Sequence, residues 1–278
     1  MSVINTNVSA ILTQNSLAKN ERAMAGAMEQ LSTGKRINSS ADDAAGLAIA
    51  SRMTAQINGL NQSVRNGNDA ISLVQTADGA LIEVTAMLQR MRTLAVQSAS
   101  DTNTTADRTA LDAEFDLLRD EIDRIGANTQ WNGENVLDAS HGINSDGEYK
   151  FQVGANADQT VDITIGNYGT ASGELLAAVT STIGIDTSAK ANLAIAGLDT
   201  AIAAVNSGRA TMGATINVLQ YAADNLANVS LNASASRSRV EDTDYSSATT
   251  ELARTQIIAQ AATAMLAQAN QIPQTVLS

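Results

Sequence analysis

Few residues of this 278-residue chain have the chemistry of a catalytic group. His141 is the single histidine, there is no cysteine, and no G-x-S-x-G segment occurs. A serine nucleophile would therefore need His141 as its base, and a thiol nucleophile is impossible. His141 lies in a stretch rich in Gly, Asn and Ser, which favours a solvated loop residue. We expect no catalytic residues and no enzyme.

Two short segments have part of a ligand-binding pattern. Ser32–Lys35 ends like a phosphate-binding loop, but Glu29 occupies the first glycine position and Arg36 follows the lysine. Asn144–Glu148 has only part of a calcium loop, and its composition is typical of a turn. Neither segment predicts a cofactor.

Acidic side chains are concentrated on one predicted helix. They are Asp112, Glu114, Asp116, Asp120, Glu121 and Asp123. A metal site needs ligands that converge from several elements. Arg119 and Arg124 are interspersed here, which favours a solvated charged face. We therefore expect no metal site.

The composition favours long helices that assemble. Apolar residues make up 44% of the chain but aromatic residues only 3%, and the single proline is Pro273. Such a core suits closely packed helices, and almost nothing interrupts them. The net charge of −12 argues against nucleic acid or an anionic membrane as a partner. Met1–Asn20 lacks the basic and apolar regions of a secretory signal peptide.

Two helices are predicted in the first half. Apolar or small residues recur every seven positions from Leu60 to Ala95, and again from Ser63 to Ser98, which indicates a coiled-coil-like seam. Ser40–Asp43 has capping-box spacing, so this helix should begin near Ala41. Thr104–Asp107 repeats the signature and predicts a second helix, which Gly126 or Asn128 would end.

Heptads return in the last third, from Leu198 to Leu226. A polar interval, Asn228–Asp244, then precedes a final helix. We predict a weak apolar seam between the two ends of the chain: Ile4, Val8, Ile11, Leu17, Met24, Met28, Leu31, Ile258, Ala262, Met265, Ala269 and Ile272. Because each stripe buries little area by itself, these ends should pair with each other or with other copies of the chain.

The centre of the chain has a different character. The seven-residue period disappears over residues 131–189, where Glu148–Val153 and Thr160–Ile165 alternate apolar and polar residues around a turn-rich segment. This predicts a β-hairpin, and an irregular loop with chance alternation is the alternative. The predicted fold is therefore mainly α: a long antiparallel coiled-coil-like helical bundle with a small β-hairpin region.

Several segments closely resemble bacterial flagellins. They cover about residues 1–165 and 190–278, and include MSVINTNVSAILTQNSLAKN (Met1–Asn20), LSTGKRINSSADDAAGLAIASRM (Leu31–Met53), QINGLNQSVRNGNDAISLVQTADGAL (Gln56–Leu81), LQRMRTLAVQSAS (Leu88–Ser100), FQVGANADQT (Phe151–Thr160) and ARTQIIAQAATAMLAQANQIPQTVLS (Ala253–Ser278). The resemblance implies a structural subunit of the flagellar filament, exported unfolded through a type III apparatus and assembled at the distal tip.

The resemblance also implies a domain organisation. Residues 1–42 and 237–278 would form a terminal coiled-coil domain, which folds and pairs in the inner tube of the polymer. Residues 43–140 and 190–236 would form the helical core, and 141–189 the hairpin and a short variable segment. Because Gly166–Lys190 leaves no room for outer domains, the chain resembles a core-only flagellin. Implied partners are other copies of the chain, an export chaperone at the C-terminal helix, and the cap and hook–filament junction proteins.

The resemblance assigns a specific role to one surface. Gln89, Arg90, Leu94, Gln97 and Glu114 match positions that, in many flagellins, contact other subunits and the animal receptor Toll-like receptor 5. Thr93 stands where strongly recognised members have an acidic residue. The residues alone favour a subunit contact beside the buried seam.

Two other functions compete with the filament subunit. A hook–filament junction protein would resemble flagellin at both ends, but LQRMRTLAVQ and GANADQT favour flagellin. A chemoreceptor-type helical hairpin would have two long helices and no β-hairpin.

Overall fold

The computed structural model describes residues 6–138, 147–168 and 184–277, with side chains to residue 271. The helices in this part are α1 (Val8–Thr33), α2 (Ala44–Ala99), α3 (Thr105–Asn128), α4 (Ser188–Glu241) and α5 (Tyr245–Leu277). The strands are β1 (Gln130–Trp131), β2 (Glu134–Asn135), β3 (Glu148–Gln152) and β4 (Thr160–Thr164). His141 and most of Asn144–Glu148 lie outside the described residues. The predicted mainly α architecture is confirmed.

The chain forms two compact units. The terminal unit consists of Met1–Ile57 and Leu231–Ser278, and the central unit of Asn58–Ser230. Helices α2 and α4 each contribute residues to both units, so the units are connected by continuous helix.

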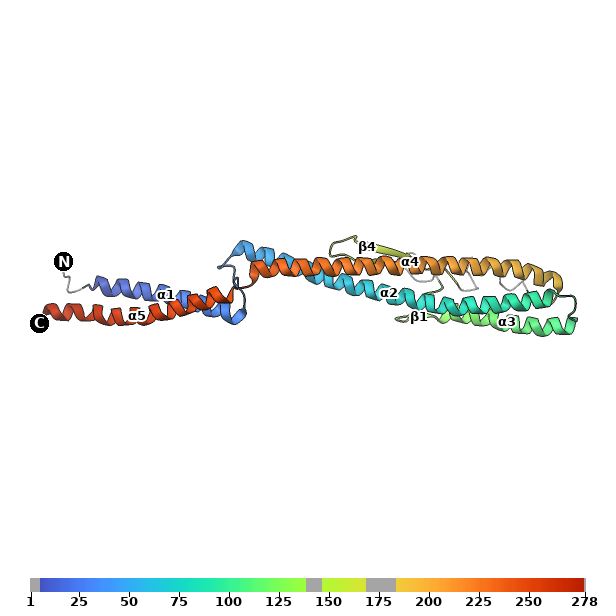
Figure 1. The fold of residues 1–278 in the computed structure, drawn as a ribbon, viewed down its shortest axis with the longest axis horizontal. Helices are drawn as coiled ribbons and strands as arrows, with labels where there is room; N and C mark the ends of the chain where they lie inside the picture. Colours follow the sequence, from blue (N-terminus) through green and yellow to red (C-terminus); the bar gives the residue numbers. More distant parts are fainter. Residues whose placement is uncertain (1–5, 139–146, 169–183, 278) are drawn as a thin grey trace. The chain divides into compact units, whose positions relative to one another are not determined.

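In the terminal unit, α1 and α5 lie side by side in antiparallel directions (Figure 1). Side-chain amides of α1 bond to carbonyl groups of α5 along this contact. Asn7 Nδ2 donates to the Ala269 carbonyl at 2.8 Å, and the buried Asn20 donates to the Thr255 carbonyl at 2.7 Å. Because the contact residues are small or polar, few large apolar side chains are buried there, and this helix pair contributes little hydrophobic stabilisation.

The links between helices in the terminal unit bond to each other. Gly34 ends α1 in the left-handed conformation, φ 72°, which glycine adopts without strain. Its carbonyl accepts from Thr243 N at 3.0 Å, and Arg36 N donates to the Glu241 carbonyl at 2.7 Å. Lys35 Nζ lies 2.6 Å from Glu241 Oε1. These bonds join the α1–α2 link to the α4–α5 link, two segments that are 200 residues apart in sequence.

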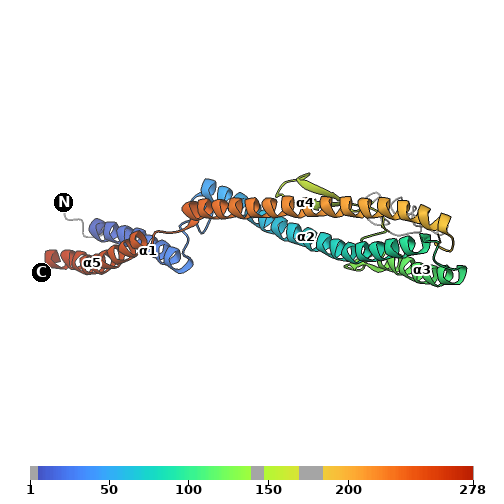
Figure 2. The same cartoon turned by 45° about the vertical axis from the view of Figure 1, so that its right-hand side comes forward.

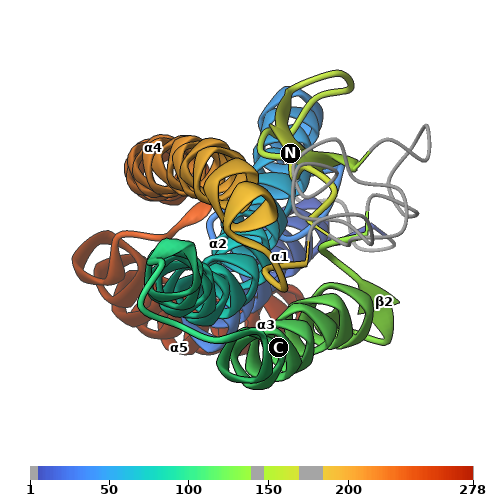
Figure 3. The same cartoon turned by 90° about the vertical axis from the view of Figure 1, so that its right-hand side faces the viewer.

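The central unit is built on α2, which lies between α3 and α4 (Figures 1 and 3). The α2–α4 pair also lies side by side in the turned view of Figure 2. The seam is the predicted one, since Leu81, Leu88 and Met91 are each 0% exposed. By length and composition alone α2 could span a membrane, but core helices of soluble proteins pass the same test, and its apolar residues line this core.

The first turn of α2 differs from the prediction. The helix begins at Ala44 rather than near Ala41, and its cap is Asp43 instead of Ser40. Asp43 Oδ1 accepts from Gly46 N at 2.8 Å, the geometry of an N-cap. Asp42 instead accepts bonds from Ser39 N and Asn38 N, and these backbone bonds hold the pKa of its carboxyl below the usual range.

The capping box of α3 is confirmed. Asp107 N donates to Thr104 Oγ1 at 3.3 Å, and Asp107 Oδ2 accepts from Thr104 N at 2.9 Å. The side-chain and backbone bonds from Thr104 lower the pKa of Asp107. The helix ends at Asn128, which is one of the two predicted end points.

The β-hairpin is also confirmed. β3 pairs with β4 in antiparallel register, with Tyr149 opposite Ile163 and Phe151 opposite Val161. Ile163 and Ile165 are buried in the core of the central unit. The short pair β1–β2 was not predicted, because two-residue strands leave no periodic pattern.

The polar interval expected before the last helix is itself helical over most of its length. Residues 228–241 continue α4 without interruption, and only the link to α5 leaves the helix. Polar side chains in this segment find partners: Ser236 Oγ donates to the Asn232 carbonyl at 2.9 Å, and Ser230 Oγ donates to Asn61 Oδ1 on α2 at 2.8 Å. A low apolar content therefore did not end the helix, because no proline or glycine breaks it.

Replacing Asp107 tests the capping box through pH. A carboxylate whose pKa is lowered by folding stabilises the folded chain above its unfolded pKa, about 4, and this stabilisation is lost as pH falls through the lowered value. We expect Asp107→Asn to melt earlier than the parent at pH 7, with the difference shrinking towards pH 2. Circular dichroism melts across this range measure it. A difference that is constant with pH would contradict the assignment.

Truncating Leu94 tests the core of the central unit. Leu94 is 1% exposed, whereas Val96 on the same helix is 49% exposed. We expect Leu94→Ala to lower the free energy of unfolding by about 2–5 kcal/mol, because it leaves a cavity. Val96→Ala is the control and should change it by less than about 0.5 kcal/mol. Denaturant titration of both variants compares them, and equal effects would refute the assignment of Leu94 to the core.

Candidate assembly surfaces

Four of the five residues predicted for the inter-subunit and receptor surface lie on an accessible face of α2 and α3. Gln89, Arg90 and Gln97 are exposed on α2, and Glu114 is partly exposed on α3. Arg90 Nη2 lies 2.7 Å from Glu114 Oε1, and Arg90 Nε donates to the same oxygen at 2.9 Å. The structure thus brings together two residues that are 24 positions apart.

Leu94 is the exception and corrects the prediction. Its side chain is buried in the core cluster with Phe115 and Leu88, so it offers no surface to another molecule. Its position beside the α2–α4 seam suggested a surface residue. However, α3 packs beside α2 (Figure 3), and Arg90, one helical turn before Leu94, pairs with Glu114 of α3, so α3 covers that side of α2. The sequence pattern of one helix does not reveal a third helix.

Arg92 pairs with α4, whereas Arg90 pairs with α3. Its Nε lies 2.6 Å from Asp199 Oδ1 on α4, and this bond lowers the pKa of the Asp199 carboxyl and raises that of Arg92. Two arginines separated by one residue therefore connect α2 to both of its neighbours. Because both pairs are exposed, each contributes little stability by itself, and their main effect is on the register of the helices.

The predicted terminal seam is only partly the one that the structure forms. Leu17, Met24, Leu31 and Ala262 are half-buried and Ala269 is buried. Val8, Ile11, Met28, Ile258 and Met265 are exposed instead. Ile4 and the side chain of Ile272 lie outside the described residues.

The observed seam follows heptads of small and polar residues. On α1 it includes Thr13, Asn20 and Ala27, seven positions apart, and on α5 Ala248, Thr255, Ala262 and Ala269. Asn20 and Thr255 are polar, so the apolar pattern did not predict them. The signal that could have found them is the same seven-residue spacing, read with small and polar residues admitted.

Large apolar side chains therefore remain on the outside of the terminal unit. The exposed fractions are 63% for Val8, 67% for Leu12, 67% for Ile257 and 62% for Met265. Single exposed apolar residues are ordinary, but these belong to two adjacent helices. They make the outer faces of α1 and α5 candidate surfaces for contact with other chains.

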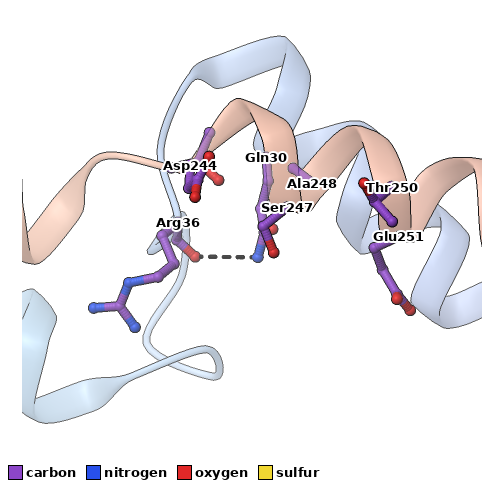
Figure 4. A pocket seen from close by; sticks show the side chains of 8 residues that line it. Gln30, Arg36, Asp244, Ser247, Ala248, Thr250 and Glu251 are labelled. Atoms are coloured by element: carbon purple, nitrogen blue, oxygen red, sulfur yellow. Dashed lines mark hydrogen bonds between the residues drawn. The ribbon is translucent and has the colours of Figure 1, made fainter.

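A pocket of about 450 Å³ lies in the terminal unit between the end of α1 with its link to α2 and the start of α5 (Figure 4). Gln30 Nε2 donates to the Arg36 carbonyl at 3.4 Å beside it. The lining contains charges of both signs, Arg36 together with Asp244 and Glu251, so no single charge class of ligand is favoured. Among the described residues, no group of three His, Cys, Asp or Glu side chains could hold a metal ion.

Comparison with known proteins identifies the family at both ends of the chain. Residues 4–141 match the bacterial flagellin N-terminal helical region, and residues 195–278 match the bacterial flagellin C-terminal helical region. The first match includes all of α1, α2 and α3, and the second includes most of α4 and all of α5.

Relatives match over nearly their whole length. A flagellin of Halalkalibacterium halodurans is 43% identical over 277 residues, covering 99% of this chain and 98% of the relative. The flagellin of Bacillus subtilis is 39% identical over 305 residues, with coverage of 99% and 98%. The crystal structure of Bacillus cereus flagellin has 35% identity and a TM-score of 0.51, covering 58% of this chain and 88% of that one. The chain therefore belongs to the bacterial flagellin family, a family of structural proteins and not of enzymes.

Proposed function

We infer that this chain is a structural subunit that polymerises into the bacterial flagellar filament. The observation that carries this function is the match to flagellin at both ends together, since the terminal unit is formed by those ends. A relative from Treponema maltophilum, 38% identical, is named a flagellar filament core protein. The hook–filament junction protein is not favoured. The β3–β4 hairpin disagrees with a chemoreceptor-type helical hairpin.

The terminal unit has the properties that a polymerising segment needs. Its internal seam buries small and polar residues, whereas Leu12, Ile257 and Met265 are exposed. Covering these side chains with other copies would remove apolar surface from water, at about 25 cal/mol per Å². We propose that residues 1–42 and 237–278 acquire most of their stability in this way and form the inner tube of the filament.

The finer steps of assembly remain proposals that rest on family membership. They are export of the unfolded chain through a type III apparatus, a chaperone at the C-terminal helix, and addition at the distal tip with cap and junction proteins. The assembled protein would be extracellular, within the filament that drives swimming. A chain that must remain unfolded for export benefits from terminal helices that are marginal by themselves.

Seeded growth tests the function. We expect purified chain added to filament fragments to form long tubular filaments in electron micrographs. Residues 1–40 and 240–278 should be cleaved by a protease in the free subunit and protected in the filament, because polymerisation covers their exposed apolar residues. Cleavage within α3, which belongs to the central unit, is the internal control for protease activity in both states. Absence of filaments under all seeding conditions, or equal protection in both states, would contradict the proposal.

The Arg90–Glu114 surface supports a second, more specific proposal. Gln89, Arg90, Gln97 and Glu114 lie close enough on α2 and α3 to form one contact surface for Toll-like receptor 5. Leu94 would act only by supporting this surface from the core. Thr93, which donates to the Arg90 carbonyl, supplies no negative charge.

Two arginines separated by one residue provide a matched test of receptor recognition. We expect Arg90→Ala to weaken receptor signalling by the free subunit about tenfold or more, because it removes an exposed guanidinium from the contact. Arg92→Ala is the control, since Arg92 pairs with Asp199 on α4 and not with Glu114. A receptor reporter assay on both variants, with helix content checked, measures this. Equal signalling by the two would rule out this role of Arg90.

A further inference from the structure

The net charge of the chain is confined to one region. Residues 101–186 hold 16 of the 29 acidic residues and 4 of the 17 basic ones, which gives −12. The remaining 13 acidic and 13 basic residues cancel. In the described part of the central unit, this region contains α3 and the β3–β4 hairpin, whereas α2 and most of α4 lie in the neutral remainder.

Charge location matters in a polymer of identical chains. The rest of the chain has no net positive charge, so no other face of a second copy can neutralise the acidic region, and close packing of many copies brings acidic regions near each other. The neutral faces of the central unit are therefore the ones that another copy can cover without this cost. Apart from Glu114, which pairs with Arg90, the acidic α3–hairpin region should remain in water.

Helix α2 has a neutral outer stripe with a heptad period. Its seven positions are all exposed and none is charged: Gln75, Gly79, Ile82, Ala86, Gln89, Thr93 and Val96. Within the chain, a Cβ added at Gly79 would meet nothing within 4 Å, so internal packing does not require glycine there. A glycine inside a helix destabilises it relative to alanine. At Gly79 the α2 stripe therefore has no side chain, and no other part of the chain occupies the space next to it.

Helix α4 has a neutral outer face with large side chains. Val218, Tyr221 and Val229 lie within a narrow arc of the helix, together with Ala214 and Asn225. Tyr221 is 76% exposed and Val218 is 53% exposed, although the chain has only four tyrosines. Leu219, on the opposite side of the helix, is buried in the core. We call Val218, Tyr221 and Val229 the α4 patch.

We propose that the α4 patch of one subunit packs onto the α2 stripe of a second copy, with Tyr221 over Gly79. The two faces differ, because one has large exposed side chains and the other has a glycine that leaves room for one of them. A contact between different faces repeats head to tail and produces open helical polymers instead of closed dimers. This inference rests on the proposed filament function and assigns the central-unit contact within it.

One substitution in each face tests the contact. In seeded growth, we expect Tyr221→Glu and Gly79→Leu each to slow elongation about tenfold or more relative to the parent, the first by adding a charge and the second by placing a large side chain where Tyr221 would pack. Leu117→Glu is the matched control, because Leu117 is 71% exposed on the acidic α3 and should tolerate the charge. Circular dichroism melts verify that each free subunit is folded.

The outcomes separate this inference from the proposed function. Failure of the parent chain to elongate would refute the filament function itself. If the parent elongates and Tyr221→Glu and Gly79→Leu elongate equally well, only the α4–α2 contact is refuted. If Leu117→Glu blocks growth as strongly as Tyr221→Glu, the argument from charge location is wrong.

Crosslinking identifies the partner of each face. The chain has no cysteine, so introduced thiols report on one contact only. In oxidised filaments we expect Gly79→Cys/Tyr221→Cys to give a ladder of linked chains, and each single variant to give none. Dimers from Tyr221→Cys alone would indicate that two α4 patches meet each other, and would overturn the head-to-tail arrangement.

Discussion

Antiparallel pairing of α2 with α4 is the interaction on which the rest of this structure depends. The buried seam of α2, with Leu81 and Leu88 at 0% exposure, is closed by α4 residues such as Leu198 and Val205. Because α2 follows α1 and α4 precedes α5, antiparallel pairing brings the start of α2 near the end of α4. The ends of the chain are then close enough for α1 and α5 to meet in the terminal unit.

Polar contacts set the register of this pairing rather than its strength. Arg92 with Asp199 and Arg209 with Asp78 connect α2 to α4 at two levels, at 2.6 and 2.8 Å. Exposed or half-exposed ion pairs of this kind contribute little net free energy. A seam of Ala, Leu and Val can slide by a heptad at small cost, whereas a wrong register would leave these charges unpaired. The apolar seam thus supplies stability and the ion pairs supply specificity.

The two units meet different requirements of a filament subunit, a stable core and a surface for contact with other copies. The central unit has a continuous core and carries the whole net charge in its α3–hairpin region. The terminal unit is close to neutral and buries mostly small and polar residues, while its large apolar side chains are exposed. Low internal burial makes the ends easy to unfold, and neutrality allows many copies to pack closely. A single chain can therefore be foldable and still dependent on its neighbours.

Much of this organisation was determined by the sequence alone. The seven-residue period from Leu60 to Ser98, the capping box at Thr104 and Asp107, and the alternation in β3 and β4 are local patterns, and local hydrogen bonds or side-chain spacing enforce them. The flagellin resemblance could also be recognised from the sequence, because its motifs are contiguous. The same resemblance predicted the residues of the Arg90–Glu114 surface, of which the structure places Leu94 in the core.

Only the tertiary structure decided the features that depend on a second or third element. Leu94 is buried because α3 covers a side of α2 that the pattern of α2 leaves open. The terminal seam runs through Asn20 and Thr255 rather than Ile258 and Met265, because a small-residue helix presents several stripes of similar hydrophobicity and the partner helix selects one. Periodicity shows which residues share a face, but the packing of other helices determines which face is covered.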